Sequence, residues 1–218
     1  MSNFTDHPVF SKKYLVFNEV LNAITHGIGV VLSIVGLVFL VQKGLEYGGA
    51  VEVTSYTVYG STLILLYLSS TLYHSLTFTR ARKVFRVIDH CSIFLLIAGT
   101  YTPYTLITIG GRLGAILTSV IWLIALLGVV YKTVWFKKFQ GLSVWLYIAM
   151  GWISLFFLNY LYQGLGTRGF IWLMAGGVSF TVGALFYRLK HVKYMHVVWH
   201  LFVLTGTVCM FFSIYLYT

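Results

Sequence analysis

Charged residues are scarce in this sequence. They make up 9% of the 218 residues, whereas 59% are hydrophobic. Soluble domains carry about 25% charged residues, because a folded chain needs polar surface to remain in water. The composition therefore excludes a soluble domain and indicates an integral membrane protein.

Several sequence signatures are also missing. We find no HExxH zinc motif, no glycine-rich phosphate loop and no serine nucleophile elbow, so the common enzymes built on them are excluded. No alternating strand pattern occurs, which argues against a β-barrel. The two cysteines, Cys91 and Cys209, fall at different depths of two spans predicted to run the same way, so no disulfide is expected between them.

Seven apolar stretches are present, and each is long enough to cross a bilayer, for which about 20 residues suffice. Each must be helical, because backbone groups in lipid have no water to bond. The stretches are residues 20–42, 53–79, 87–111, 113–131, 142–162, 169–187 and 194–218. The sequence therefore predicts an all-α, polytopic bundle of seven transmembrane helices in one domain, residues 1–218, with residues 1–19 as a cytoplasmic N-terminal segment.

The positive charge is unevenly distributed along this topology. The formal net charge of +10 would suit a nucleic-acid partner, but twelve of the fifteen Lys and Arg fall on one side of the membrane. These twelve are Lys12, Lys13, Arg80, Arg82, Lys83, Arg86, Lys132, Lys137, Lys138, Arg188, Lys190 and Lys193. The positive-inside rule then places the N-terminus in the cytoplasm and the C-terminus outside. We expect no nucleic-acid partner; the excess charge would also attract anionic lipid headgroups.

Titratable side chains of four predicted spans lie at one depth, near the predicted cytoplasmic end. They are His26, His74, Asp89, His196 and His200. His196 and His200 share one helix face, as do Ser70 and His74, with the serine one turn deeper. Ionisable groups in membrane helices normally face the bundle interior and mark a function. Glu19 precedes the first span and is expected to pair with a basic loop.

Three histidines at one depth suit a zinc site, because neutral imidazole binds Zn²⁺ at about 2.0–2.1 Å. We therefore take His74, His196 and His200 as candidate metal ligands, Asp89 and Ser70 as candidate catalytic residues, and His26 as a candidate supporting group behind a ligand. Other interpretations remain open at this point. The histidine pair is also compatible with hydrogen bonds between helices, Ser70 with helix packing, and His26 with a bond to a backbone carbonyl.

Four segments resemble the bacterial hemolysin III family, which belongs with the progestin and adipoQ receptors. They are "NAITHGIG", "SSTLYHS", "IDHCSIFLLIAGTYTPY" and "HVVWH". Alkaline ceramidases are similar at the serine, aspartate and three histidine positions. The resemblance implies Zn²⁺ on His74, His196 and His200 near the cytoplasmic face, with Asp89 close to the zinc-bound water and Ser70 nearby.

Three functions are compatible with these features. The leading hypothesis is a zinc-dependent hydrolase of a lipid amide or ester, involved in membrane lipid homeostasis, with a membrane lipid as substrate or ligand. The second is a non-enzymatic, receptor-like sensor of membrane state with a structural zinc. The third is a pore-forming, cytolytic hemolysin. The expected location is the inner membrane of a bacterium, as a multi-pass protein.

Overall fold

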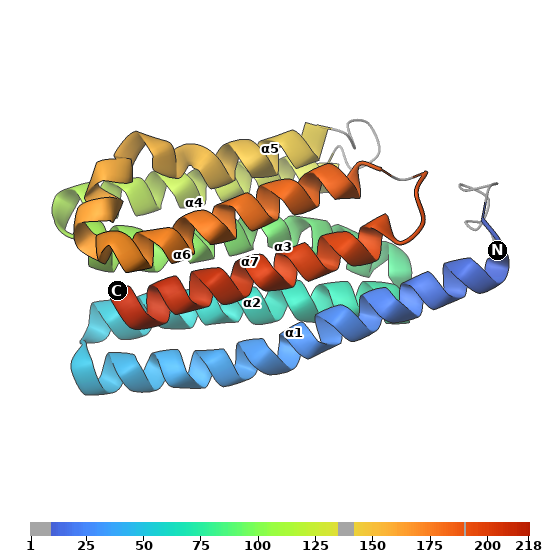
Figure 1. The fold of residues 1–218 in the computed structure, drawn as a ribbon, viewed down its shortest axis with the longest axis horizontal. Coiled ribbons are helices and arrows are strands. Elements are labelled where there is room, and N and C mark those ends of the chain that lie inside the picture. The colour runs from blue at the N-terminus through green and yellow to red at the C-terminus, as the bar shows by residue number, and fades with distance from the viewer. Residues whose placement is uncertain (1–9, 135–141, 190) are drawn as a thin grey trace.

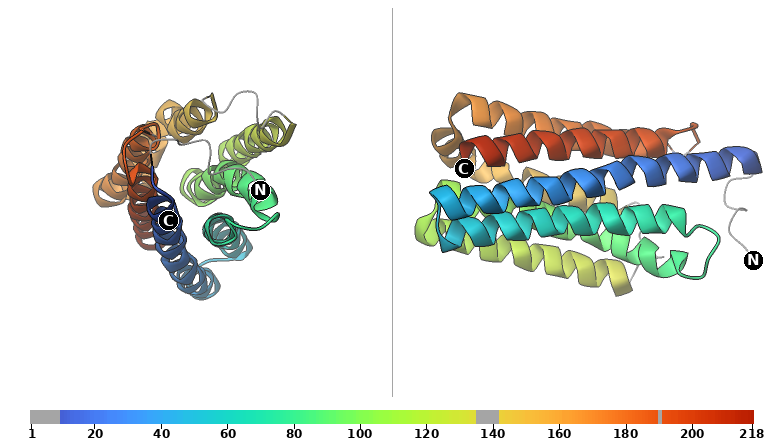
Figure 2. Two further views of the ribbon diagram at one scale, coloured as in Figure 1. Left: turned by 90° about the vertical axis from the view of Figure 1, so that its right-hand side faces the viewer. Right: turned by 90° about the horizontal axis from the view of Figure 1, so that it is seen from below.

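The computed structural model describes residues 10–134, 142–189 and 191–218, and these residues form helices with no strand among them. The α-helices are α1 (Lys12–Tyr47), α2 (Ala50–Ser75), α3 (Arg82–Pro103), α4 (Gly111–Val134), α5 (Leu142–Gly151), α6 (Leu158–Tyr187) and α7 (Met195–Tyr217). A π-helix, η1 (Tyr104–Ile109), continues α3, and a 3₁₀-helix, η2 (Trp152–Phe157), joins α5 to α6. The helices lie side by side in one bundle, as Figures 1 and 2 show.

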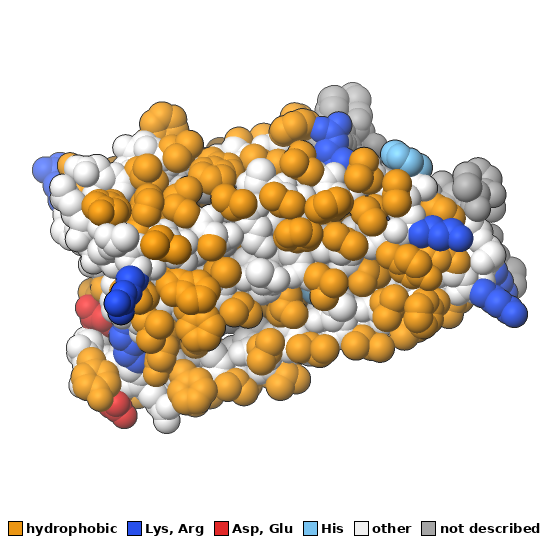
Figure 3. Space-filling model, in the orientation of Figure 1, with side chains coloured by type: hydrophobic (Ala, Val, Ile, Leu, Met, Phe, Trp, Pro, Cys, Tyr) orange, Lys and Arg blue, Asp and Glu red, His pale blue; other side chains and the backbone are white. Residues whose placement is uncertain are grey.

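Membrane-competent helices dominate this bundle. Five helical runs in the described ranges are long and apolar enough to cross a bilayer: Lys12–Tyr47, Arg82–Ile109, Gly111–Val134, Leu142–Tyr187 and Met195–Tyr217. Hydrophobic side chains cover the face shown in Figure 3, and Lys and Arg lie toward its two ends. The predicted all-α fold with several membrane-competent helices is therefore confirmed. The count of seven spans and the orientation of the termini stay predictions.

Two features explain why the count differs from seven. α2 is rich in Ser, Thr and Tyr and buries many of them against α1 and α3. Its composition is therefore too polar for it to be counted among the five membrane-competent runs. The predicted spans 142–162 and 169–187 fall within the single run Leu142–Tyr187, but helical geometry is interrupted at Gly166, where the chain turns back so that the second part lies beside α5 (Figure 1). Gly166 has φ 63° and ψ 176°, a conformation that side-chain-bearing residues rarely adopt.

The first helix begins earlier than predicted. α1 starts at Lys12, where the Ser11 hydroxyl caps it by accepting a hydrogen bond from the Tyr14 amide at 3.3 Å. Residues 12–19 therefore extend the first predicted span as a helix that projects beyond its neighbours (Figure 1). This extension matters for the site, because it brings Tyr14 and Glu19 alongside the starts of α7 and α3.

One end of the bundle, which we call the basic end, is where α1, α3, α5 and α7 begin. Its described cationic residues are Lys12, Lys13, Arg80, Arg82, Lys83, Arg86, Lys132, Arg188 and Lys193. Lys137, Lys138 and Lys190 lie outside the described residues. The basic end is the one that the positive-inside rule predicts to be cytoplasmic.

Close packing of α2 on α3 fixes the relative positions of the residues these helices carry. A methyl group added at Gly99 of α3 would clash with the Thr62 side chain of α2. Because Thr62 is buried and bonded to the Tyr59 carbonyl, it has little room to move away. The glycine therefore permits the close approach of the two helices.

We predict that Gly99→Ala lowers the free energy of unfolding by about 1–3 kcal/mol, the usual cost of overpacking a filled interior. Thermal unfolding of the detergent-solubilised protein measures this change. Gly151→Ala is the matched control, because no atom beyond its chain neighbours and its own helix backbone lies within 4 Å of the added methyl group. Equal melting temperatures for the two variants would contradict the proposed close contact.

Candidate metal centre

Three histidines from two helices meet at the basic end. His74 lies in the last turn of α2, and His196 and His200 lie in the first two turns of α7. Their ring centroids are 4.8–5.0 Å apart, and one nitrogen from each ring falls within 4.8 Å of the other two. His74 and His200 are buried, and His196 is partly exposed. The structure thus brings together the three histidines singled out in the sequence, and this group could hold a metal ion.

The start of α7 is positioned by α1. Tyr194, the residue before α7, has a left-handed conformation with φ 64°. Its backbone N–H donates a hydrogen bond to the Tyr14 hydroxyl at 2.9 Å, and its ring packs edge-on against Tyr14 with centroids 5.0 Å apart. Phe17 adds a second edge-on contact to the Tyr194 ring. These contacts fix the turn that delivers His196 to the site.

A carboxylate orients His74. Glu19 Oε2 lies 2.6 Å from His74 Nδ1, and Glu19 Oε1 accepts a hydrogen bond from the Arg82 guanidinium at 2.8 Å. Since the carboxylate only accepts, Nδ1 carries the ring proton in this arrangement and Nε2 keeps its lone pair. His74 Nε2 is buried and has no hydrogen-bond partner among the described residues. A buried, lone-pair-bearing nitrogen of this kind fits a metal ligand supported by a carboxylate behind it.

His200 is oriented in the same sense by α1. Its Nδ1 lies 3.2 Å from the Asn22 carbonyl oxygen and 3.3 Å from the Thr25 hydroxyl. A carbonyl oxygen can only accept, so Nδ1 is the protonated nitrogen and Nε2 is available for a metal. His26 stacks on His200 with ring centroids 3.5 Å apart and an interplanar angle of 10°. The donor set of the site therefore fits a divalent metal that binds imidazole.

Asp89 and Ser70 lie on the wall facing these histidines. The Ser70 hydroxyl is within hydrogen-bonding reach of the Asp89 carboxylate, and both residues line one cavity together with His196 and His200. The neighbouring His90 donates its Nδ1–H to the Arg86 carbonyl oxygen at 2.7 Å, and the same nitrogen lies 3.5 Å from Asp89 Oδ2. Asp89 and His90 therefore both line the cavity, with the imidazole beside the carboxylate.

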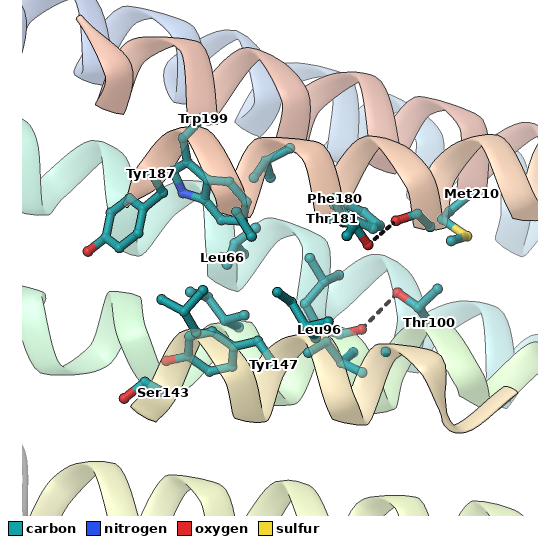
Figure 4. A pocket seen from close by; sticks show the side chains of 18 of the residues that line it. Leu66, Leu96, Thr100, Ser143, Tyr147, Phe180, Thr181, Tyr187, Trp199 and Met210 are labelled. Atoms are coloured by element: carbon teal, nitrogen blue, oxygen red, sulfur yellow. Dashed lines mark hydrogen bonds between the residues drawn. The ribbon is translucent and has the colours of Figure 1, made fainter. Parts of the chain in front are cut away.

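The cavity has a volume of about 280 Å³ and extends from this polar wall along the bundle. Away from the histidines its lining is mainly apolar and includes Leu96, Ile97, Leu161, Leu173 and Met210. Figure 4 shows Ser143, Tyr147, Tyr187 and Trp199 toward one end of this space and Thr100, Thr181 and Met210 toward the other. An elongated molecule with one polar end would match this change from a polar to an apolar lining along the cavity.

Some of the contacts in this site could not be predicted from the spacing of residues in the sequence. The predicted pairing of Glu19 with a basic segment is confirmed by the Arg82 ion pair, but its contact with His74 was missed. The contacts of Asn22 and Thr25 with His200 were missed as well. A usable signal existed, since Asn22, Thr25 and His26 recur at helical spacing in "NAITHGIG" and therefore share one face.

The chain is similar in sequence to a known protein family and to two bacterial proteins. The family model described as "Haemolysin-III related" matches residues 14–211. A "Hemolysin-3 homolog" of Bacillus subtilis (strain 168) is 44% identical over 204 residues, which is 94% of this chain and 96% of that protein. "Hemolysin-3" of Bacillus cereus is 44% identical over 202 residues, 93% and 92% of the two chains.

An animal protein is more distantly similar. "Monocyte to macrophage differentiation factor" of Homo sapiens is 25% identical over 209 residues, 92% of this chain and 84% of that protein. With the five membrane-competent runs, these relatives identify a multi-pass bacterial membrane protein. The resemblance noted in the sequence is confirmed, and the chain belongs to the hemolysin III family.

Proposed function

We propose that this protein is a zinc-dependent hydrolase that cleaves an amide or ester bond of a membrane lipid. The observation that carries the proposal is that two of the three candidate ligands, His196 and His200, open with Asp89 and Ser70 into one cavity whose far walls are largely apolar. A lipid enters such a space with its chain along the apolar walls and its carbonyl group at the polar end.

His74, His196 and His200 would hold the metal, leaving room for further ligands as catalytic zinc sites do. When bound, Zn²⁺ supplies a Lewis acid for the carbonyl oxygen of the substrate. Glu19 keeps His74, and Asn22 keeps His200, in the tautomer that presents Nε2 to the metal. The stacked ring of His26 limits rotation of His200.

Asp89 is the proton acceptor in this mechanism. Its carboxylate faces the cavity, so it can take a proton from the attacking water and pass it to the leaving amine or alcohol. Ser70 lies beside it and can donate its hydroxyl proton to the oxygen on which negative charge develops. Ser70 is buried and Asp89 is half-buried among the helices, which limits the access of bulk water and strengthens these interactions.

A second function, a non-enzymatic sensor, is favoured by one specific observation. The three histidines would join α2 to α7 through the metal, and Glu19 links the same group to Arg82 at the basic end. A structural metal there could couple the state of the membrane to the basic segments. The printed name of the Bacillus cereus relative, "Hemolysin-3", raises cytolysis as a third possibility, which conductance measurements on reconstituted bilayers test.

We predict that Asp89→Asn binds zinc at the wild-type stoichiometry but hydrolyses lipid about 10²–10⁴ times more slowly, since a general base contributes that factor. His200→Ala is expected to lose both metal and activity. Zinc content is measured by elemental analysis and hydrolysis by mass spectrometry of a panel of amide and ester lipids. Glu46→Gln, a carboxylate-to-amide change at an exposed position of the opposite end, is the control.

Full activity in zinc-free protein would refute the hydrolase mechanism. Retention of both metal and the cellular phenotype in Asp89→Asn would instead support the sensor.

We predict that Glu19→Gln weakens zinc binding about 10- to 100-fold, because loss of the carboxylate behind a ligand histidine has that effect. Competition with a chromophoric chelator measures the dissociation constant. Glu52→Gln is the matched control, since glutamine can still accept the Gly49 N–H bond that caps α2. Equal zinc affinities of the two variants would show that Glu19 does not support the metal centre.

A further inference from the structure

A second hollow reaches the candidate metal site from outside the main cavity. It lies between the first part of α1 and the end of α2, and we call it the α1–α2 groove. Glu19 and Val20 line it from α1, and His74 and Thr77 line it from the end of α2 and the residues that follow. Glu19 and His74 thus belong both to this groove and to the candidate metal site. The proposed hydrolase mechanism makes no use of the groove itself.

Oxygen atoms that can bind a metal are present where the groove reaches Glu19. The Glu19 side chain is 20% exposed and that of His74 is 2% exposed, so the carboxylate is the group that can be reached from outside. The Thr77 hydroxyl lies near this carboxylate and is buried without a well-formed hydrogen bond to any described residue. Because carboxylate oxygen is itself a zinc ligand, the groove offers a divalent ion a first point of attachment.

One imidazole ring separates the groove from the three-histidine site. His74 Nδ1 faces Glu19 Oε2 at 2.6 Å, while the buried Nε2 is the nitrogen left for the metal. A cation bound by Glu19 competes with this hydrogen bond, because both use lone pairs of the same carboxylate. Its arrival would therefore free the ring to turn and let the ion pass on to His196 and His200.

Arg82 controls access to the carboxylate. Its guanidinium donates a hydrogen bond to Glu19 Oε1 at 2.8 Å and lies over the Tyr73 ring, 5.3 Å from its centroid. The Arg82 side chain is 22% exposed, so it can turn away from Glu19 into solvent. An incoming cation must displace this positive group or bind beside it, and the repulsion slows capture.

The main cavity is a less favourable route for a cation. At the basic end it is lined by Arg86, Lys132 and Arg188, with Asp89 among them. The α1–α2 groove has Glu19 and neither Lys nor Arg among its described lining residues. Since a passage lined by charge of one sign attracts ions of the opposite sign, the groove is the better approach.

We infer that a divalent metal ion enters and leaves the three-histidine site through the α1–α2 groove, with Glu19 as its first ligand. The inference rests on the metal centre of the proposed function and is independent of catalysis. It gives Glu19 a second task, the capture of the ion, besides the orientation of His74 once the ion is in place.

Stopped-flow measurement of Zn²⁺ uptake by the metal-free, full-length protein, and of its release to excess chelator, tests the inference. Val20→Trp places a large side chain in the groove at a position that is 46% exposed, so the fold tolerates it. We expect uptake and release to slow by one common factor, on the order of tenfold, with an unchanged dissociation constant, because a raised barrier acts on both directions alike. Val31→Trp is the matched control, since Val31 is 61% exposed on the same helix and does not line the groove.

Arg82→Gln tests the same route independently. Removal of the competing positive charge should speed uptake on the order of tenfold, since one unit charge acting on a divalent ion across a few ångströms of water changes the barrier by about that factor. The gain should shrink as salt is raised, because salt screens exposed charges. Arg80→Gln is the control, with the same change of charge at an exposed position of the basic end.

An uptake rate unchanged in either Val20→Trp or Arg82→Gln would overturn the inference. Slower uptake by Val20→Trp with unchanged release would overturn it as well, because the variant would then have lost affinity without any block of the path.

Lipid hydrolysis is measured on the same samples and separates the two proposals. Uptake that depends on the groove supports the entry route even if no hydrolysis is seen, in which case only the proposed hydrolase fails. Zinc-dependent hydrolysis with uptake that ignores the groove would have the reverse meaning. A protein that binds no zinc would overturn both.

Discussion

The site depends on the meeting of α2 and α7 at the basic end, where His74 faces His196 and His200. Buried imidazoles at this separation are stable only if each ring has defined partners, and α1 supplies them through Glu19 for His74 and the Asn22 carbonyl for His200. The first helix thus determines which ring nitrogen of His74 and of His200 faces the candidate metal site. The close packing of α2 on α3 at Gly99 helps to fix the helix that carries Asp89.

Much of this arrangement follows from the sequence. The uneven distribution of Lys and Arg, combined with the apolar stretches, predicts one depth for His74, His196, His200 and Asp89, and these side chains do lie around one region at the basic end. Depth along a helix is readable because the rise per residue is constant. The catalytic roles of Asp89 and Ser70 and the identity of the metal stay predictions.

Other features were not readable because they depend on how each helix is rotated and on pairs far apart in the sequence. The bond from Glu19 to His74 joins α1 to α2 across 55 positions and is encoded by no spacing rule. The reversal of the chain at Gly166, inside α6, depends on the backbone freedom of glycine, and apolar periodicity does not report it. The polar composition of α2 likewise makes sense only once its burial is known.

The strained turn at Tyr194 has a mechanical consequence. A left-handed backbone at a residue other than glycine costs on the order of 1–3 kcal/mol and persists only while its surroundings hold it. Here the surroundings are Tyr14 and Phe17, on the part of α1 that projects beyond its neighbours. Anything that pulled this protruding stretch away would let the turn relax, and His196 would swing with it. The projecting start of the first helix would then hold His196 in place at the candidate metal site.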